Sequence, residues 1–252
     1  MADKSGADGG LRELALFAGA GGGILGGKLL GWRTVCAVEI NPYAACILAS
    51  RQNDGILNPF PIWDDICTFD GKPWRGCVDV VSGGFPCQDI SVAGKGAGLD
   101  GDRSGLWKEM FRVISEVRPR YCFVENSPML TVRGGAKVIA DLASMGYMGR
   151  NGCLGGHSVG SCSNGERMWI VAFKADSELL EGVDVQKYKV SDKAQSCRRQ
   201  YLRAVSAMLS QDDYTNLKRD RNAVAAGMDR LKAIGNGQVP AVARLAWEIL
   251  ST

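Results

Sequence analysis

Apolar residues gather in short runs along the chain, and polar or glycine-rich segments separate these runs. Runs that carry apolar side chains without alternation are typical of strands that are covered on both faces of a sheet. Such runs lie at residues 11–17, 34–38, 77–82, 121–124 and 168–173, with a weaker candidate just before Asp64 and Asp65. We therefore predict a sheet whose strands are mostly buried.

Between these runs the apolar residues recur at helical spacing. A helix is predicted at residues 24–30, directly after a glycine turn, and another from Leu106 to Val117, where Pro119 ends the pattern. A C-terminal helix is predicted from the apolar stripe of Val242, Leu245, Ala246 and Ile249. This alternation of strands and helices favours an α/β fold with a doubly wound, mostly parallel sheet.

The alternation breaks in one polar and basic segment near the C-terminus. We predict a catalytic and cofactor-binding α/β domain at residues 1–174, a small inserted subdomain at 175–231 and a segment at 232–252 that returns to the first domain. Residues 185–232 hold eleven basic and five acidic residues, although the whole chain carries a net charge of only +3. Such a segment fits either a solvated helical surface or a nucleic-acid contact surface.

Composition narrows the class of protein further. The 33 glycines among 252 residues are about twice the usual share, which indicates many tight turns or close approaches to a ligand. The nine cysteines contain no C-x-x-C pair, so we expect neither a disulfide framework nor a metal site, and most cysteines as small buried residues. No apolar run is long enough for a membrane span, which predicts a cytoplasmic protein without membrane contact.

Two features near the N-terminus predict a cofactor site. The glycine turn at residues 17–23 follows a strand and opens a helix, where free backbone amides can hold a charged group. Glu39 follows Gly19 by twenty residues at the end of the next strand, where a carboxylate can accept hydrogen bonds from ribose hydroxyls. NAD, FAD and S-adenosylmethionine would each fit this pair, and so would a purely structural glycine turn.

A reactive loop is predicted at residues 82–91, which read SGGFPCQDIS. Cys87 lies between Pro86 and Gln88 in this glycine-bounded loop after a strand, a setting more typical of an exposed nucleophile than of a core cysteine. The end of the following strand supplies Glu125, in the sequence VENSPM, on the same side of the sheet.

Taken in order, these motifs closely resemble those of the DNA cytosine-5 methyltransferases. FAGAGGG is similar to the first cofactor motif, GGFPCQDIS to the nucleophile loop and VENSPM to the motif of the catalytic glutamate. NGERMWIVAF resembles the arginine-bearing strand, and AIGNGQVP resembles the motif that completes the cofactor pocket. The resemblance implies a Rossmann-like, S-adenosylmethionine-dependent methyltransferase fold, and it makes the inserted subdomain a target-recognition region.

The resemblance also implies roles for individual residues. Methyl transfer to carbon 5 of a flipped cytosine would be carried by Cys87 as the nucleophile and Glu125 as the acid at ring nitrogen 3. Arg167 would contact the flipped base and orient Glu125. The resemblance and the turn chemistry together place S-adenosylmethionine, which leaves S-adenosylhomocysteine as product, against Phe17, Ala18, Gly19, Ala20, Gly21, Gly22, Glu39, Ile40, Asp65, Ile66, Gly84, Pro86 and Asn236.

Double-stranded DNA is the expected partner of a monomeric protein in a prokaryotic or phage-infected cell. A base flipped out of a duplex needs a loop to close over it, and the glycine-rich stretch at residues 94–105 could do this, although it also fits an ordinary surface loop. We expect DNA contacts from the residues of this loop and of the basic segment, namely Gln88, Ser91, Lys95, Arg103, Arg198, Arg199 and Arg203.

Some positions depart from the family pattern or leave alternatives open. The arginine motif usually reads Gln-x-Arg-x-Arg, and here its positions are Ser163, Gly165 and Arg167. An RNA cytosine methyltransferase shares these motifs but usually has a second proline where this chain has Phe85. A non-catalytic DNA-binding homologue and a nicotinamide oxidoreductase are further alternatives. Cys87 and Glu125 tell against the former, and the Pro-Cys-Gln loop tells against the latter.

Overall fold

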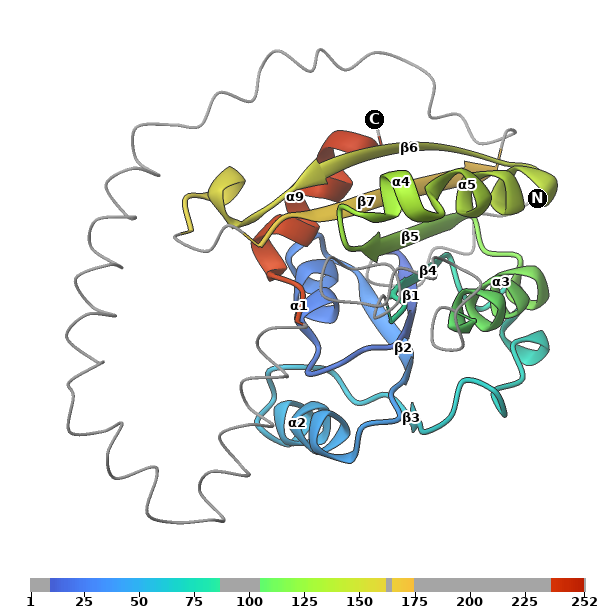
Figure 1. The fold of residues 1–252 in the computed structure, drawn as a ribbon. Helices are drawn as coiled ribbons and strands as arrows, with labels where there is room; N and C mark the ends of the chain where they lie inside the picture. The colour runs from blue at the N-terminus through green and yellow to red at the C-terminus, as the bar shows by residue number, and fades with distance from the viewer. Residues whose placement is uncertain (1–9, 87–104, 162–164, 175–236, 252) are drawn as a thin grey trace, which may run out of the picture.

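The fold was analysed in a computed structural model, which describes residues 10–86, 105–161, 165–174 and 237–251 (Figure 1). The predicted target-recognition region at residues 175–231 lies outside the described residues. The described part is a sheet between two layers of helices.

The first half of the chain alternates strands and helices as predicted. Its elements are β1 (Arg12–Leu16), α1 (Gly22–Leu29), β2 (Arg33–Val38), α2 (Pro42–Asn53), β3 (Ile62–Trp63), the short 3-10 helix η1 (Lys72–Trp74) and β4 (Val80–Gly84). The sequence pattern did not predict α2, although Asn41 caps this helix by accepting a hydrogen bond from the Ala44 amide at 3.1 Å, and Pro42 occupies its first turn.

The second half of the chain adds three strands and the remaining helices. Its elements are α3 (Leu106–Val117), β5 (Tyr121–Asn126), α4 (Leu130–Arg133), α5 (Gly135–Ser144), β6 (Tyr147–Leu154), the 3-10 helix η3 (Gly156–Val159), β7 (Arg167–Lys174) and α9 (Pro240–Leu250). The strand predicted at residues 77–82 is wrong at both ends, because Cys77 lies in a turn and the ladder continues through Gly84, which pairs with Glu125.

The seven strands of the described residues form one sheet in the order β3-β2-β1-β4-β5-β7-β6. Only β7 runs against the others, since both of its pairings are antiparallel and the pairings among β1 to β5 are parallel. The predicted doubly wound, mostly parallel sheet is therefore confirmed. The strand order reverses between β1 and β4, and ligands of such sheets bind at the carboxyl ends of the strands at this reversal.

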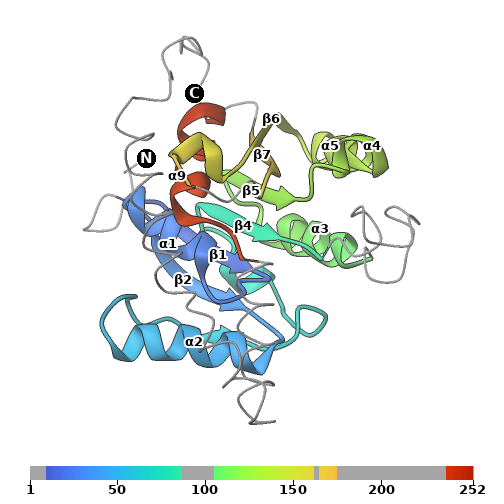
Figure 2. The same cartoon turned by 60° about the vertical axis from the view of Figure 1, so that its left-hand side comes forward.

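Helices cover both faces of the sheet (Figure 2), and each face has its own core. On one face, α3 and α5 bury Met110, Ile114 and Val138 against alternate residues of the central strands. On the other face, α9 packs over β4, β5 and β7, while α1 and α2 cover β1 and β2. Within the described residues, no helix is both long and apolar enough to span a membrane.

One carboxyl group joins the three strands around the reversal. Glu13 of β1 is 1% exposed, and its two oxygens accept hydrogen bonds from the hydroxyls of Thr34 in β2 and Ser82 in β4, both at 2.6 Å. Burial raises the pKa of this carboxyl, whereas the two hydroxyl donors lower it.

The cysteines differ from the sequence expectation. Of the six in the described residues, Cys36 and Cys122 are buried, whereas Cys46, Cys67, Cys77 and Cys153 are exposed. The expectation that most cysteines are buried is wrong for these four. They lie on a helix flank, in turns and on the outermost strand β6, where the local sequence leaves a side chain in solvent.

Trp247 is the aromatic residue that holds α9 to the sheet. Its ring meets those of Trp32, Tyr121 and Phe123 edge-on, at centroid distances of 4.6, 5.3 and 5.5 Å. We predict that Trp247→Ala lowers the free energy of unfolding by about 3 to 5 kcal/mol, the usual cost of removing a buried aromatic side chain. Chemical denaturation would measure it.

Arg244→Ala is the matched control on the same helix. Arg244 is half exposed and pairs with Glu248 one turn later. Such a helix ion pair typically contributes about 0.3 to 0.5 kcal/mol to the free energy of unfolding. Equal losses in the two variants would contradict the role given to Trp247.

Candidate functional site

A cleft of about 710 Å³ opens at the carboxyl ends of the central strands, beside the reversal of strand order. Eleven of the residues that the sequence assigned to catalysis or cofactor binding line it. They are Phe17, Gly19, Ala20, Glu39, Ile40, Asp65, Ile66, Gly84, Pro86, Glu125 and Arg167. The structure thus brings together residues from six separate segments of the chain.

The glycine turn forms the floor of this cleft. Phe17 has a φ of 52°, a left-handed backbone that is uncommon for a bulky residue, and Gly19 and Gly21 have φ values of 54° and 86°. Ala18 and Gly22 line a smaller adjoining hollow of about 50 Å³. Gly21 lines neither space; a Cβ atom there would lie 2.6 Å from the side chain of Leu48 in α2, so its lack of a side chain serves helix packing.

Glu39 fastens the end of β2 to this turn. Its Oε2 accepts a hydrogen bond from the Gly19 amide at 2.6 Å, and its Oε1 accepts one from the Asn41 amide at 2.7 Å. Each carboxylate oxygen offers about two acceptor positions, so each keeps one for a ligand. The adjacent Ile40 is 69% exposed and presents an apolar side chain to the cleft.

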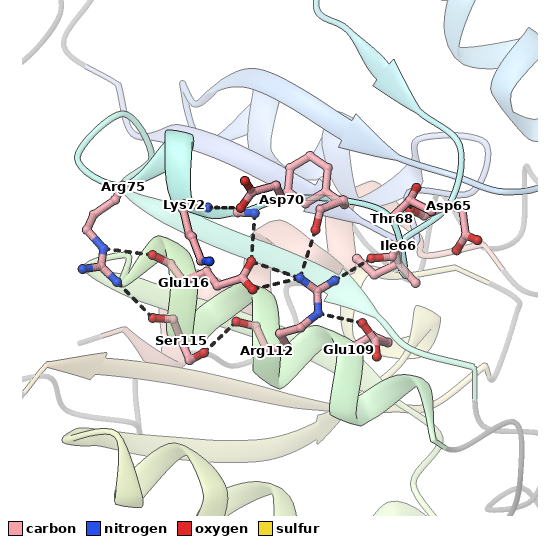
Figure 3. Close-up of polar contacts among 12 residues, drawn as sticks. Asp65, Ile66, Thr68, Asp70, Lys72, Arg75, Glu109, Arg112, Ser115 and Glu116 are labelled. Atoms are coloured by element: carbon pink, nitrogen blue, oxygen red, sulfur yellow. Dashed lines mark hydrogen bonds and ion pairs between the residues drawn. The ribbon is translucent and has the colours of Figure 1, made fainter.

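The opposite wall of the cleft is the loop after β3, which contains Asp65 and Ile66. Arg112 of α3 holds this loop (Figure 3): its Nη2 donates to the Ile66 carbonyl at 2.7 Å and its Nη1 to the Phe69 carbonyl at 2.9 Å. Glu109 and Glu116, on the same helix, accept from the Arg112 guanidinium at 2.8 and 3.0 Å. The backbone next to Asp65 is therefore fixed before any ligand binds.

Two contacts position the start of the predicted nucleophile loop. The Asn126 side chain, 2% exposed, donates to the Phe85 carbonyl at 3.0 Å. The Phe85 ring packs on that of Trp107 at 5.3 Å, which brings the residues just before position 87 close to those just after position 104. Cys87 itself lies outside the described residues, three positions beyond the end of β4.

Glu125, near the end of β5, lies beside this loop start, because it pairs with Gly84 of β4. It is 7% exposed; its Oε1 lies 3.0 Å from Nε of Arg167, and its Oε2 accepts a hydrogen bond from Nε2 of Gln238 at 3.3 Å. Burial raises the pKa of Glu125 to about 7, although Arg167 and Gln238 both lower it. A carboxyl group with this pKa can donate a proton or a strong hydrogen bond near neutral pH.

The remaining predicted residues are Cys87, Gln88, Ser91, Lys95, Arg103, Arg198, Arg199, Arg203 and Asn236, which all lie outside the described residues. The sequence reasoning missed Arg112, Asn126 and Gln238, whose side chains hold the site together. Asn126 and Gln238 stand inside motifs that were singled out for a neighbouring residue, so a search of those motifs for buried polar side chains could have found them. Nothing local distinguishes Arg112 from any other helical arginine.

Comparison with known proteins identifies a family for this chain. The sequence profile of the C-5 cytosine-specific DNA methylases matches residues 11–235. The type II methyltransferase M.PspPI of Psychrobacter sp. is 38% identical over 137 residues, which make up 52% of this chain and 32% of that protein. The type II methyltransferase M.CviJI of Paramecium bursaria Chlorella virus IL3A is 27% identical over 192 residues, 74% of this chain and 50% of that protein.

The fold agrees with this comparison. The crystal structure of the Dnmt2 methyltransferase of S. pombe superposes with a TM-score of 0.53 at 22% identity, covering 70% of this chain and 52% of that one. The chain spans about a third of the length of M.PspPI and half of that of M.CviJI. Because the family profile covers nearly the whole chain, and its motifs line one cleft in a Rossmann-like fold, the chain belongs to the C-5 cytosine-specific DNA methylase family.

Proposed function

We propose that this chain transfers the methyl group of S-adenosylmethionine to carbon 5 of a cytosine in double-stranded DNA. The observation that carries this proposal is the ion pair between the buried Glu125 and the partly exposed Arg167, which lines the same cleft as the glycine turn and lies beside the strand that leads to Cys87. Unlike the buried Glu13, which only joins strands, Glu125 lines the cleft beside the start of the Cys87 loop, where its carboxyl group can act on a bound base.

The described residues fit the cofactor in shape and polarity. A cleft of about 710 Å³ is within the size range of small-molecule sites, about 300 to 1,000 Å³. A Cβ atom at Gly19 would meet nothing within 4 Å, so the turn leaves open space beside the free acceptor positions of Glu39. We assign the ribose to Glu39, the adenine to the wall of Ile40, Asp65 and Ile66, and the methionine end to the glycine turn with Asn236.

When bound, S-adenosylmethionine supplies an electrophilic methyl group on a sulfonium centre. Carbon 5 of cytosine is a poor nucleophile until a thiolate adds to carbon 6, and we assign this addition to Cys87. Glu125 donates a proton or hydrogen bond to ring nitrogen 3 as the carbon–sulfur bond forms, so the electron pair is available at carbon 5. After methylation, a base removes the carbon 5 proton and the bond to Cys87 breaks.

Arg167 has two tasks in this scheme. Its guanidinium holds Oε1 of Glu125 at 3.0 Å, and its position at the start of β7 faces the same cleft. This leaves Arg167 able to contact a base that has been flipped out of the duplex. The duplex itself would be bound by Gln88, Ser91, Lys95 and Arg103 and by the basic residues of the 175–231 segment.

We predict that Cys87→Ser abolishes methyl transfer, because a serine hydroxyl is far less ionised than a thiol near neutral pH. Bisulfite sequencing of DNA from cells that express each protein measures the activity and identifies the target site together. DNA that contains 5-fluorocytosine should trap the wild-type protein covalently, since the fluorine cannot leave as a proton does. Methylation that persists in Cys87→Ser would contradict the mechanism.

We predict that Glu39→Ala weakens binding of S-adenosylmethionine by about 1 to 3 kcal/mol, because the amides of Gly19 and Asn41 and the ribose hydroxyls then lose their partly buried acceptor. Calorimetric titration would measure the affinity. Glu248→Ala, far along α9, serves as the control. Tight binding of NADH in place of S-adenosylmethionine would refute the cofactor assignment.

We predict that Glu125→Gln removes a pH dependence of folding stability. The pKa of Glu125 rises from 4.5 to about 7 on folding, so its contribution is fully present below pH 4.5 and is lost as the pH rises to about 7. The wild type should lose up to about 3 kcal/mol over this interval that Glu125→Gln does not lose. Urea denaturation at pH 5 and pH 8 measures the difference. Equal slopes in the two proteins would show that Glu125 ionises normally.

A further inference from the structure

Gln238 lies in the segment just before α9, and its side chain contacts Glu125, which lines the cleft. Its amide nitrogen donates to Oε2 of Glu125 at 3.3 Å, across 113 residues of sequence. Gln238 also lines the smaller hollow, together with the glycine turn. One side chain therefore touches both the catalytic carboxyl group and the floor of the proposed cofactor site.

The glycines around Gln238 form a slot that fits it. A Cβ atom at Gly22 would lie 2.1 Å from the Gln238 carbonyl oxygen, and one at Gly23 would lie 2.4 Å from its Oε1. A Cβ atom at Gly84 would lie 3.2 Å from its Nε2 and 2.3 Å from Oε2 of Glu125. Gln238 can therefore reach Glu125 because these positions of α1 and β4 are glycines.

Both oxygens of Glu125 are held by separate donors on separate elements. Arg167 of β7 lies 3.0 Å from Oε1, and Gln238 holds Oε2, so the plane of the carboxyl group is fixed by two contacts. Arg167 brings a full positive charge, whereas the Gln238 amide is neutral. A second cation at position 238 would favour the carboxylate strongly, but an amide fixes the same oxygen with a smaller electrostatic effect.

The other ionisable groups of the cleft lie on different walls. The described residues that line it include Glu39 after β2, Tyr43 of α2 and Asp64, Asp65 and Cys67 after β3. Of the charged side chains described, Arg167 is the one within ion-pair distance of Glu125. The thiol of Cys87, which belongs to the same proposed site, lies outside the described residues.

We propose that Gln238 is a positioning residue, which fixes Oε2 of Glu125 and thereby sets both the direction and the acidity of the proposed general acid. This inference rests on the proposed function for its catalytic meaning. The hydrogen bond itself stabilises the charged carboxylate, so its removal makes Glu125 a weaker acid. The 3.3 Å distance is long, as catalytic hydrogen bonds often are before substrate binds.

The first experiment measures the Glu125–Gln238 coupling without any activity. Urea denaturation between pH 4 and pH 9 locates the interval in which stability is lost as Glu125 ionises, using Glu125→Gln as the reference. In Gln238→Met the upper end of this interval should move up by about one pH unit. Gln238→Glu places a second carboxyl group at the same spot and should move it further. In the Glu125→Gln background, Gln238→Met should have the same effect on stability at every pH.

The second experiment measures catalysis. Single-turnover methyl transfer needs protonated Glu125, so its rate should fall on the alkaline side, and this limb should move to higher pH in the order wild type, Gln238→Met, Gln238→Glu. Gln238→Asn keeps the amide but is too short to reach Oε2, so it should behave as Gln238→Met does and replaces that variant if the methionine disturbs folding.

Gln52 provides a matched control glutamine. Its Nε2 donates to the Phe60 carbonyl at 3.2 Å, and its Oε1 accepts from the Phe60 amide at 3.3 Å. Gln52→Met should therefore leave the stability interval and the alkaline limb of the rate at the wild-type pH. A uniform loss of rate with an unmoved alkaline limb in Gln238→Met, or an unmoved stability interval, would overturn the inference and leave Gln238 a packing residue. If the wild type methylates no DNA, the proposed function fails, yet the denaturation series still decides whether Gln238 controls Glu125.

Discussion

The end of β4 carries no side chains, and the arrangement of the site depends on this. A Cβ atom at Gly83 would lie 2.5 Å from the Leu16 carbonyl oxygen, so only glycine lets β4 pair this closely with β1 at the reversal of strand order. At Gly84 the same space is filled by the Glu125 carboxyl group and the Gln238 amide. The two glycines therefore bring the glycine turn, Glu125 and the residues that lead to Cys87 to one point.

Burial decides the acidity of Glu125, and a second ion pair in the same sheet shows the opposite outcome. Asp79 is also partly buried, but it accepts three hydrogen bonds from Arg12, each at 2.8 Å, and these outweigh burial, so the pKa of Asp79 falls. Glu125 is more deeply buried and receives one ion-pair contact and one amide, so burial wins and its pKa rises. A buried carboxyl group with few hydrogen-bond donors has a raised pKa and keeps its proton. Several donors to the carboxylate lower the pKa, so the group ionises.

The sequence predicted the parts of the site that are local. β1, the glycine turn and Glu39 follow one another within thirty residues, and their spacing reflects chain geometry alone. The missed side chains act across the fold: Arg112 reaches Ile66 over 46 residues, Asn126 reaches Phe85 over 41, and Gln238 reaches Glu125 over 113. The strand β6 was missed because it lies at the edge of the sheet and exposes most of its side chains, so it has no apolar run.

The contact between Gln238 and Glu125 ties the chemistry to the packing of the C-terminal helix. Gln238 stands two residues before α9, and α9 is held to the sheet by the Trp247 ring among Trp32, Tyr121 and Phe123. On the other side, α9 presses on α1, where a Cβ atom at Gly26 would lie 2.7 Å from that of Ala243. Because a close-packed interior transmits strain, a shift of α9 changes the position of the Gln238 amide against Glu125. The acidity of Glu125 therefore depends on the position of α9 as well as on the nearest charges.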